Sequence, residues 1–183
     1  MGNFLQYLTM GIEHILSGYD HLLFLCGLII ARMSKLDILK VLTAFTVGHC
    51  MTLALSSLEL VSLPPSIIEP LIALSIVYIT IENLFLKKLN HRWIVTLFFG
   101  LIHGFGFSEI LRGTLSDEFV VPLFSFNLGV EVGQIMVLAA VLPLIWAFKQ
   151  TKLDERILVS GGSAVVACFG LYWFVERMTQ QFL

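Results

Sequence analysis

Six long runs of apolar residues follow one another along the chain, and short segments that hold most of the charged residues separate them. Each run offers roughly the 20 mostly apolar residues that a helix needs to cross the hydrocarbon core of a membrane. We therefore predict an all-α, polytopic membrane protein: a bundle of six transmembrane helices forming one integral membrane domain over residues 1–183. The predicted helices cover residues 4–31, 38–60, 66–87, 93–113, 119–148 and 156–176.

The composition agrees with this pattern, because 57% of the residues are hydrophobic and only 13% are charged, with a mean hydropathy of +0.91. A soluble domain is markedly less apolar. The net charge of −2 is too small to indicate a nucleic-acid partner, so the lipid bilayer is the expected surrounding. The first apolar run has no basic segment before it and already contains Glu13, His14 and Asp20, so we expect no cleaved signal peptide.

Basic residues gather in the connections after the first, third and fifth predicted helices. These connections hold Arg32, Lys35 and Lys40, then Lys87, Lys88 and Arg92, then Lys149, Lys152 and Arg156. Arg112 and Arg177 fall at the opposite ends of the helices. Because basic connections stay in the cytoplasm, both termini are predicted to lie outside, and the expected location is the inner membrane of a bacterium.

Polar residues inside the predicted helices need a reason, because each costs about 2–3 kcal/mol or more when it faces lipid. In the first helix they form one stripe at helical spacing. The second and fourth helices each place a histidine near mid-membrane, and the fifth carries a polar stripe around a carboxylate. The residues are Glu13, His14, Ser17, Asp20 and His21 in the first helix, Thr46 and His49 in the second, His103 in the fourth, and Asn127, Glu131 and Gln134 in the fifth.

A single membrane histidine is more often a packing residue than a ligand, but a cluster at similar depth favours a functional site. We predict a metal site with the ligands His14, Asp20, His21, His49, His103 and Glu131, supported by Glu13, Ser17, Thr46, Glu82, Asn127 and Gln134. Imidazole and carboxylate together suit nickel, zinc, cobalt or iron. Glu82 could instead pair with Lys87, and His91 is expected to be a solvated loop residue.

The motifs around these residues resemble the second branch of the HupE/UreJ family of hydrogenase and urease accessory membrane proteins. The resemblance rests on His14-x-x-x-Gly18-x-Asp20-His21, Gly48-His49, Glu82-Asn83, His103-Gly104-Phe105-Gly106-Phe107 and Asn127-x-Gly129-x-Glu131-x-Gly133-Gln134. It implies a histidine-rich membrane protein that binds or carries nickel or cobalt for metalloenzyme maturation. The better-studied branch has His-Pro where this chain has His14-Ile15, so the resemblance implies metal binding and leaves the metal open.

Several functions stay open at this point. The first is transport of a divalent, nickel-like metal or a metallocentre-accessory role, with binding that depends on pH because the imidazoles must be deprotonated. The alternative is an enzyme, an intramembrane zinc-type hydrolase acting on a lipid or a membrane-embedded peptide, with Asp20 or Glu131 as general base and Ser17 near His21. Histidines on facing helices could also ligate haem. A homo-oligomer stays open as well.

The order of the predicted helices suggests a repeat. Three helices followed by three more give two halves of opposite orientation, and Gly11-x-x-His14 in the first half echoes Gly100-x-x-His103 in the second. Such inverted repeats occur in membrane transporters.

Overall fold

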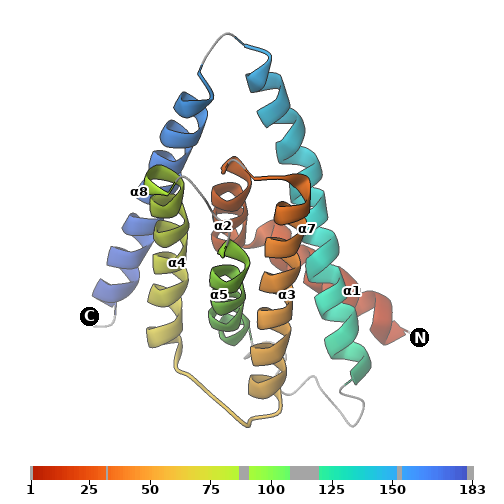
Figure 1. Ribbon diagram of the computed structural model, residues 1–183. Coiled ribbons are helices and arrows are strands. Elements are labelled where there is room, and N and C mark those ends of the chain that lie inside the picture. The colour runs from red at the N-terminus through yellow and green to blue at the C-terminus, as the bar shows by residue number, and fades with distance from the viewer. Residues whose placement is uncertain (1, 32, 87–90, 108–119, 152–153, 181–183) are drawn as a thin grey trace.

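The computed structural model describes residues 2–31, 33–86, 91–107, 120–151 and 154–180, and every regular element within these ranges is a helix (Figure 1). The helices are α1 (Gly2–Ser17), α2 (Tyr19–Ile30), α3 (Lys35–Ser57), α4 (Pro65–Phe85), α5 (Arg92–Gly106), α7 (Val120–Lys149) and α8 (Glu155–Gln180). The second, third, fifth and sixth predicted helices correspond to α3, α4, α7 and α8, with ends that agree to within a few residues.

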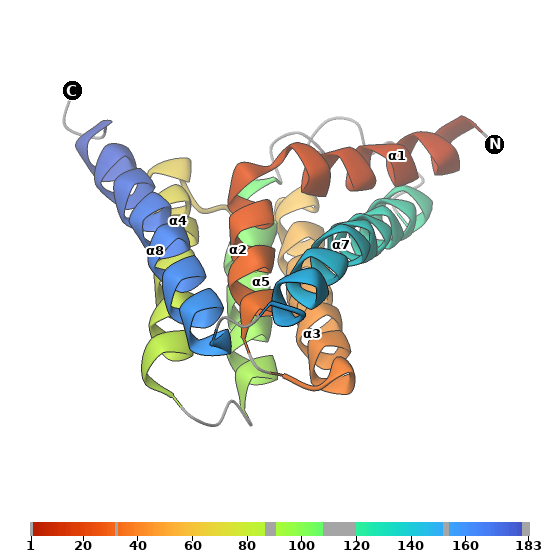
Figure 2. The same ribbon diagram turned by 90° about the horizontal axis from the view of Figure 1, so that it is seen from above.

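The prediction of one continuous helix over residues 4–31 is wrong. The backbone of Gly18 is extended, with φ −78° and ψ 97°, and the chain changes direction there. Figure 2 shows α1 running across the direction of α2. The polar stripe predicted for the first helix is therefore divided between two helices that point in different directions.

Within the described ranges, four helices are long and apolar enough to cross a membrane, namely α3, α4, α7 and α8. The apolar helices α2 and α5 are shorter, with 12 and 15 residues against the roughly 20 that a span requires. The chain is thus an all-helical integral membrane protein, while six spans and external termini stay predictions. Several residues used for the topology, among them Lys88, Arg112 and Lys152, lie outside the described residues.

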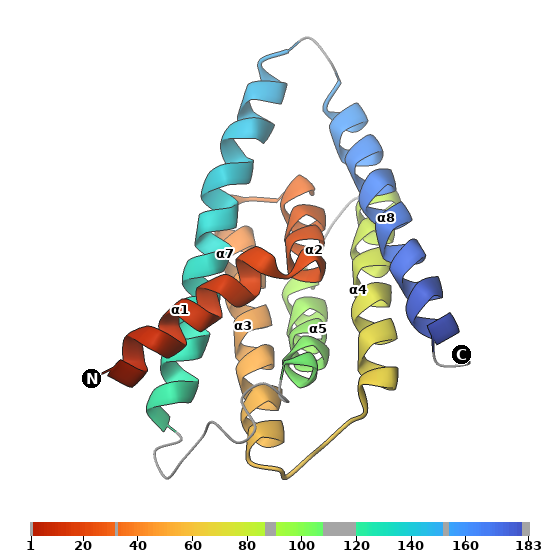
Figure 3. The ribbon, with the colours of Figure 1, turned by 180° about the vertical axis from the view of Figure 1, so that it is seen from behind.

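The helices associate mainly as three pairs: α1 with α7, α3 with α5, and α4 with α8. Seen from behind in Figure 3, the first pair lies on one side of the molecule and α4 with α8 on the other, with α2, α3 and α5 between them. The two members of each pair lie far apart in the sequence. The pairing therefore closes the chain into one bundle.

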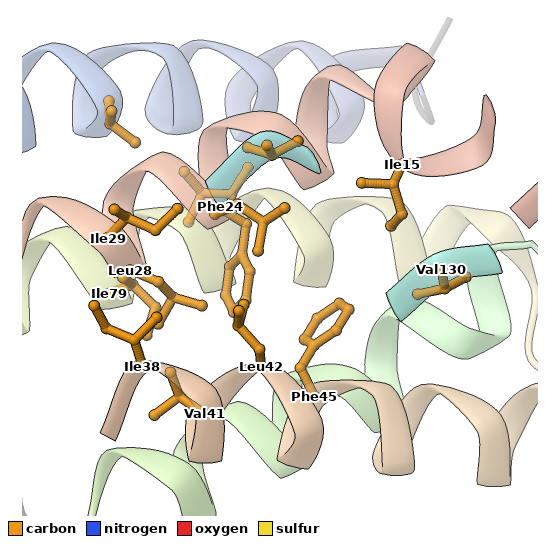
Figure 4. Packing of buried hydrophobic residues seen from close by; sticks show 14 of the residues in the cluster. Ile15, Phe24, Leu28, Ile29, Ile38, Val41, Leu42, Phe45, Ile79 and Val130 are labelled. Atoms are coloured by element: carbon orange, nitrogen blue, oxygen red, sulfur yellow. The ribbon is translucent and has the colours of Figure 1, made fainter. Parts of the chain in front are cut away.

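Buried apolar side chains from α1, α2, α3, α4 and α7 fill the centre of this bundle (Figure 4). Ile15 and Val130 are fully buried, and Phe24 and Phe45 are 1% exposed. The outward faces carry exposed large apolar residues such as Phe98 on α5. An apolar outer face suits a helix whose solvent on that side is lipid.

A buried polar cluster joins the helices near the last turns of α2. The guanidinium of Arg92, at the start of α5, donates to the side-chain oxygen of Asn83 at 2.7 Å and lies 3.8 Å from the carboxylate of Glu82. Asn83 in turn donates to the carbonyl of Gly27 at 2.8 Å and to Ser163 at 3.1 Å. Arg92 was counted as a cytoplasmic loop charge, but it is only 2% exposed, so it is a buried structural cation.

Candidate metal centre

Three of the predicted ligands meet in one place. His14 from α1, His21 from α2 and His49 from α3 each offer a ligand atom, and these atoms all lie within 4.8 Å of one another. The ring centroids are 4.4 Å apart for His14 and His21, 5.7 Å for His14 and His49, and 6.4 Å for His21 and His49. Three imidazoles from three helices therefore surround a single point.

The interruption of the helix at Gly18 creates this arrangement. On one continuous helix His14 and His21 would sit seven residues apart along a face, whereas the break turns α2 so that the two rings meet edge to face. Only glycine fits between them: a Cβ added to Gly18 would lie 2.7 Å from the carbonyl oxygen of His14 and 2.8 Å from Nδ1 of His21. In the sequence, the only indication of this interruption in the helix is a glycine in the middle of an apolar run.

Three of the ring nitrogens at the site make no hydrogen bond among the described residues. These are Nε2 of His14 and both ring nitrogens of His49, all buried, and His49 is 0% exposed. A buried polar atom without a partner is costly, so such atoms indicate a missing bonded group. A metal ion held about 2.1 Å from each nitrogen would supply it, and because tetrahedral ligands then stand about 3.4 Å apart, the nitrogens must approach one another by up to about 1.4 Å on binding. The donor set fits a transition metal.

Aromatic rings form the walls around the three histidines. His49 stacks on Phe45 at 6.1 Å and on Phe126 at 6.3 Å, and the ring of His14 lies 4.0 Å from that of Phe107. These phenylalanines place apolar surface around the site. Sequence reasoning missed their role because phenylalanine is frequent throughout the chain.

His103 adjoins the site from α5. Its Nδ1 lies 3.4 Å from Nε2 of His21, and its Nε2 lies 3.0 Å from the hydroxyl of Ser75, a buried α4 residue that sequence reasoning missed. The Ser75 hydroxyl donates its only proton to the carbonyl of Ile72 at 2.6 Å, so it accepts from Nε2 of His103. A neutral imidazole with its proton on Nε2 has its lone pair on Nδ1, so Nδ1 of His103 accepts the hydrogen bond from Nε2 of His21.

The two predicted carboxylate ligands are not part of the three-histidine group. Asp20 accepts from the guanidinium of Arg177 at 2.7 Å, which joins α2 to α8. Glu131 accepts from the hydroxyl of Thr43 at 3.3 Å. Within the described ranges, the structure thus brings together histidines and leaves these carboxylates with other partners.

The predicted supporting residues also separate. Thr46 donates to the side-chain oxygen of Gln134 at 3.2 Å, which links α3 to α7 one turn from His49, and Asn127 donates to the Leu123 carbonyl at 2.8 Å. The remaining three lie elsewhere: Glu13 and Ser17 are exposed on α1, where Ser17 donates to the Glu13 carbonyl, and Glu82 faces Arg92. The suggested pairing of Ser17 with His21 is therefore absent from the described geometry.

Comparison with known proteins gives one family. A family model described as HupE / UreJ protein matches residues 1–177. Neither a curated protein nor a solved structure matches the chain. The match covers nearly the whole chain, including every helix that contributes to the three-histidine group.

Proposed function

The chain belongs to the HupE/UreJ family, and we propose that it binds a divalent transition metal within the membrane and carries it, in nickel-like metal transport or in supply of metal to a metalloenzyme. His14, His21 and His49 are the proposed ligands. The proposed location is the inner membrane of a bacterium.

One observation carries the proposal: three imidazoles from separate helices converge, and among the described residues the most buried of them, His49, makes no hydrogen bond of ordinary length at either nitrogen. Asn127 is the polar side chain that interacts with it. A histidine retained only for packing would bond to a neighbouring hydroxyl or carbonyl. The neutral imidazole nitrogen is also the preferred protein ligand of nickel, zinc and cobalt.

Among the residues that the structure describes, no carboxylate belongs to this group, which favours a carrier over a store. Three neutral imidazoles leave the charge of a divalent cation uncompensated in an apolar surrounding, which lowers the affinity. A conduction site needs binding that is favourable enough for entry and weak enough for release. A hydrolase would need a general base within reach of a metal-bound water, and in the described part of the chain Glu131 is bonded to Thr43 instead.

The experiment compares wild type with His49→Ala and with His91→Ala as the matched control, since His91 is an exposed histidine at the start of α5. The protein is purified without chelators and without a polyhistidine tag, and bound nickel, zinc and cobalt are measured by titration and by elemental analysis. Wild type and His91→Ala should bind one ion, whereas His49→Ala should lose it and stay folded. Equal binding by all three proteins would overturn the proposal.

A second variant tests whether Glu131 is a ligand. Glu131→Gln keeps the bond with Thr43 possible and removes the charge. Metal stays bound in a protein whose ligands are the three histidines, and metal uptake into liposomes continues. If this variant lost the metal, the ligand set proposed from the sequence, which includes Glu131, would replace the three-histidine set.

A further inference from the structure

Two of the three helix pairs are in contact through equivalent pairs of glycines. In the α1 and α7 pair, a Cβ added to Gly11 would overlap the carbonyl oxygen of Phe126, and one added to Gly129 would overlap that of Leu8. The two backbones are therefore in direct contact, and each glycine faces a carbonyl of the other helix. Small residues allow this approach between membrane helices.

The α5 and α3 pair repeats the contact residue by residue. A Cβ on Gly100 would overlap the carbonyl oxygen of Phe45, and one on Gly48 would overlap that of Leu97. Leu-x-x-Gly-x-x-His thus occurs on α1 and on α5, ending in His14 and His103, and Phe-x-x-Gly occurs on α7 and on α3. The helices α1 and α5 also both end three residues after this histidine, at Ser17 and Gly106.

The partners are exchanged between the two halves of the chain. Helix α1 of the first half packs on α7 of the second half, and α5 of the second half packs in the same way on α3 of the first. The remaining pair, α4 with α8, joins the last helices of the two halves. Such reciprocal pairing is what a two-fold relation between the two halves of the chain produces, so the echo seen in the sequence extends to both members of each pair.

The repeat places His14 and His103 at equivalent positions around a shared centre. His14 lies 5.7 Å from the ring of Phe126, and His103 lies 5.1 Å from that of the equivalent Phe45. His21 stands between them, with ring centroids 4.4 Å from His14 and 5.1 Å from His103. By contrast, the position equivalent to His49 is Val130, so His49 has no counterpart.

We propose that His14 and His103 are alternative ligands of one ion, which His21 and His49 hold while the two repeats exchange conformations. The described state joins His14 to the group, and the exchanged state joins His103 in its place. Ser75 prepares His103 for this role, because it holds the His103 proton on Nε2 and so keeps the lone pair on Nδ1. In the described state this lone pair accepts from Nε2 of His21 at 3.4 Å, and it can turn to the ion when His21 gives up that hydrogen bond. Exchange of conformation between inverted repeats is the basis of alternating access.

This inference rests on the proposed function, and two measurements on the full chain test it. Binding of nickel and of zinc is measured in detergent, and uptake of the same ions is measured in liposomes, for wild type, His14→Ala, His103→Ala and the double variant, with His91→Ala as control. Each single variant should still bind, about 10-fold to 100-fold more weakly, because one alternative ligand remains. Both should lose uptake, because the ion has no second ligand to move to, and the double variant should not bind.

The outcomes separate the two proposals. If wild type binds no metal, the proposed function fails. If wild type binds, His14→Ala alone abolishes binding and His103→Ala leaves binding and uptake at wild-type values, the three-histidine site stands and the exchange of ligands is refuted. Thermal unfolding is measured in parallel, and His103→Asn, which keeps a polar group facing Ser75, replaces the alanine variant if that variant does not fold.

Discussion

Gly18→Ala should weaken metal binding although residue 18 is not a ligand. The added Cβ would lie 2.8 Å from Nδ1 of His21, whereas ordinary contact begins near 3.4 Å, so the ring must retreat by the difference, about 0.6 Å. Metal sites tolerate deviations of about 0.2 Å in ligand distance. A displacement three times larger should lower the affinity for nickel or zinc about 10-fold to 100-fold. The overpacking against the carbonyl of His14 should also destabilise the fold by about 1–3 kcal/mol.

The matched control is Gly161→Ala, because a Cβ at Gly161 in α8 meets no atom within 4 Å. Alanine is the better helix former, so this variant should unfold at the same or a slightly higher temperature and bind metal as wild type does. Titration of both purified variants with nickel and zinc, together with thermal unfolding, decides the matter. Wild-type affinity in a folded Gly18→Ala protein would refute the inference that the break at Gly18 positions His21.

Three further predictions follow from the ion pairs and from the charge pattern. Asp20→Asn should keep bound metal and lower the unfolding temperature, since its partner is Arg177; loss of metal in elemental analysis would restore Asp20 as a ligand. Arg92→Ala should destabilise by about 3–5 kcal/mol, measured by thermal unfolding, because it leaves a buried carboxylate without its cation; a change below about 1 kcal/mol would show that the cluster does not stabilise the fold. In a protein without native cysteines, a cysteine at Lys35 should react only from the cytoplasm and one at Glu59 only from outside, and the reverse pattern would invert the topology.

The sequence was sufficient to predict that the chain is a helical membrane protein and to single out its intramembrane histidines as candidate metal ligands. Hydropathy sums over neighbouring residues, so the runs that became α3, α4, α7 and α8 could be located to within a few residues. The cost of a polar group in lipid makes each intramembrane histidine conspicuous, and the three that converge were all among the predicted ligands.

Only the tertiary structure decided which polar residues are neighbours. The interruption of the helix at Gly18 divides the polar stripe of the first predicted helix between α1 and α2. Asp20 then pairs with Arg177, and the ring of His14 contacts that of His21. These outcomes depend on contacts between helices far apart in the sequence, which local patterns do not encode. Ser75 was missed for the same reason, because a serine in an apolar helix gives no indication of the histidine that it will face.

The repeat illustrates both what the sequence determined and what only the tertiary structure decided. The glycine and histidine spacing on α1 and α5 could be read from the sequence, but a glycine does not specify which backbone will approach it. The structure supplied the partners, Phe126 and Phe45, and thereby the exchanged pairing of the two halves. Close backbone contact is a property of two helices together, and for that reason the sequence of either helix alone could not determine it.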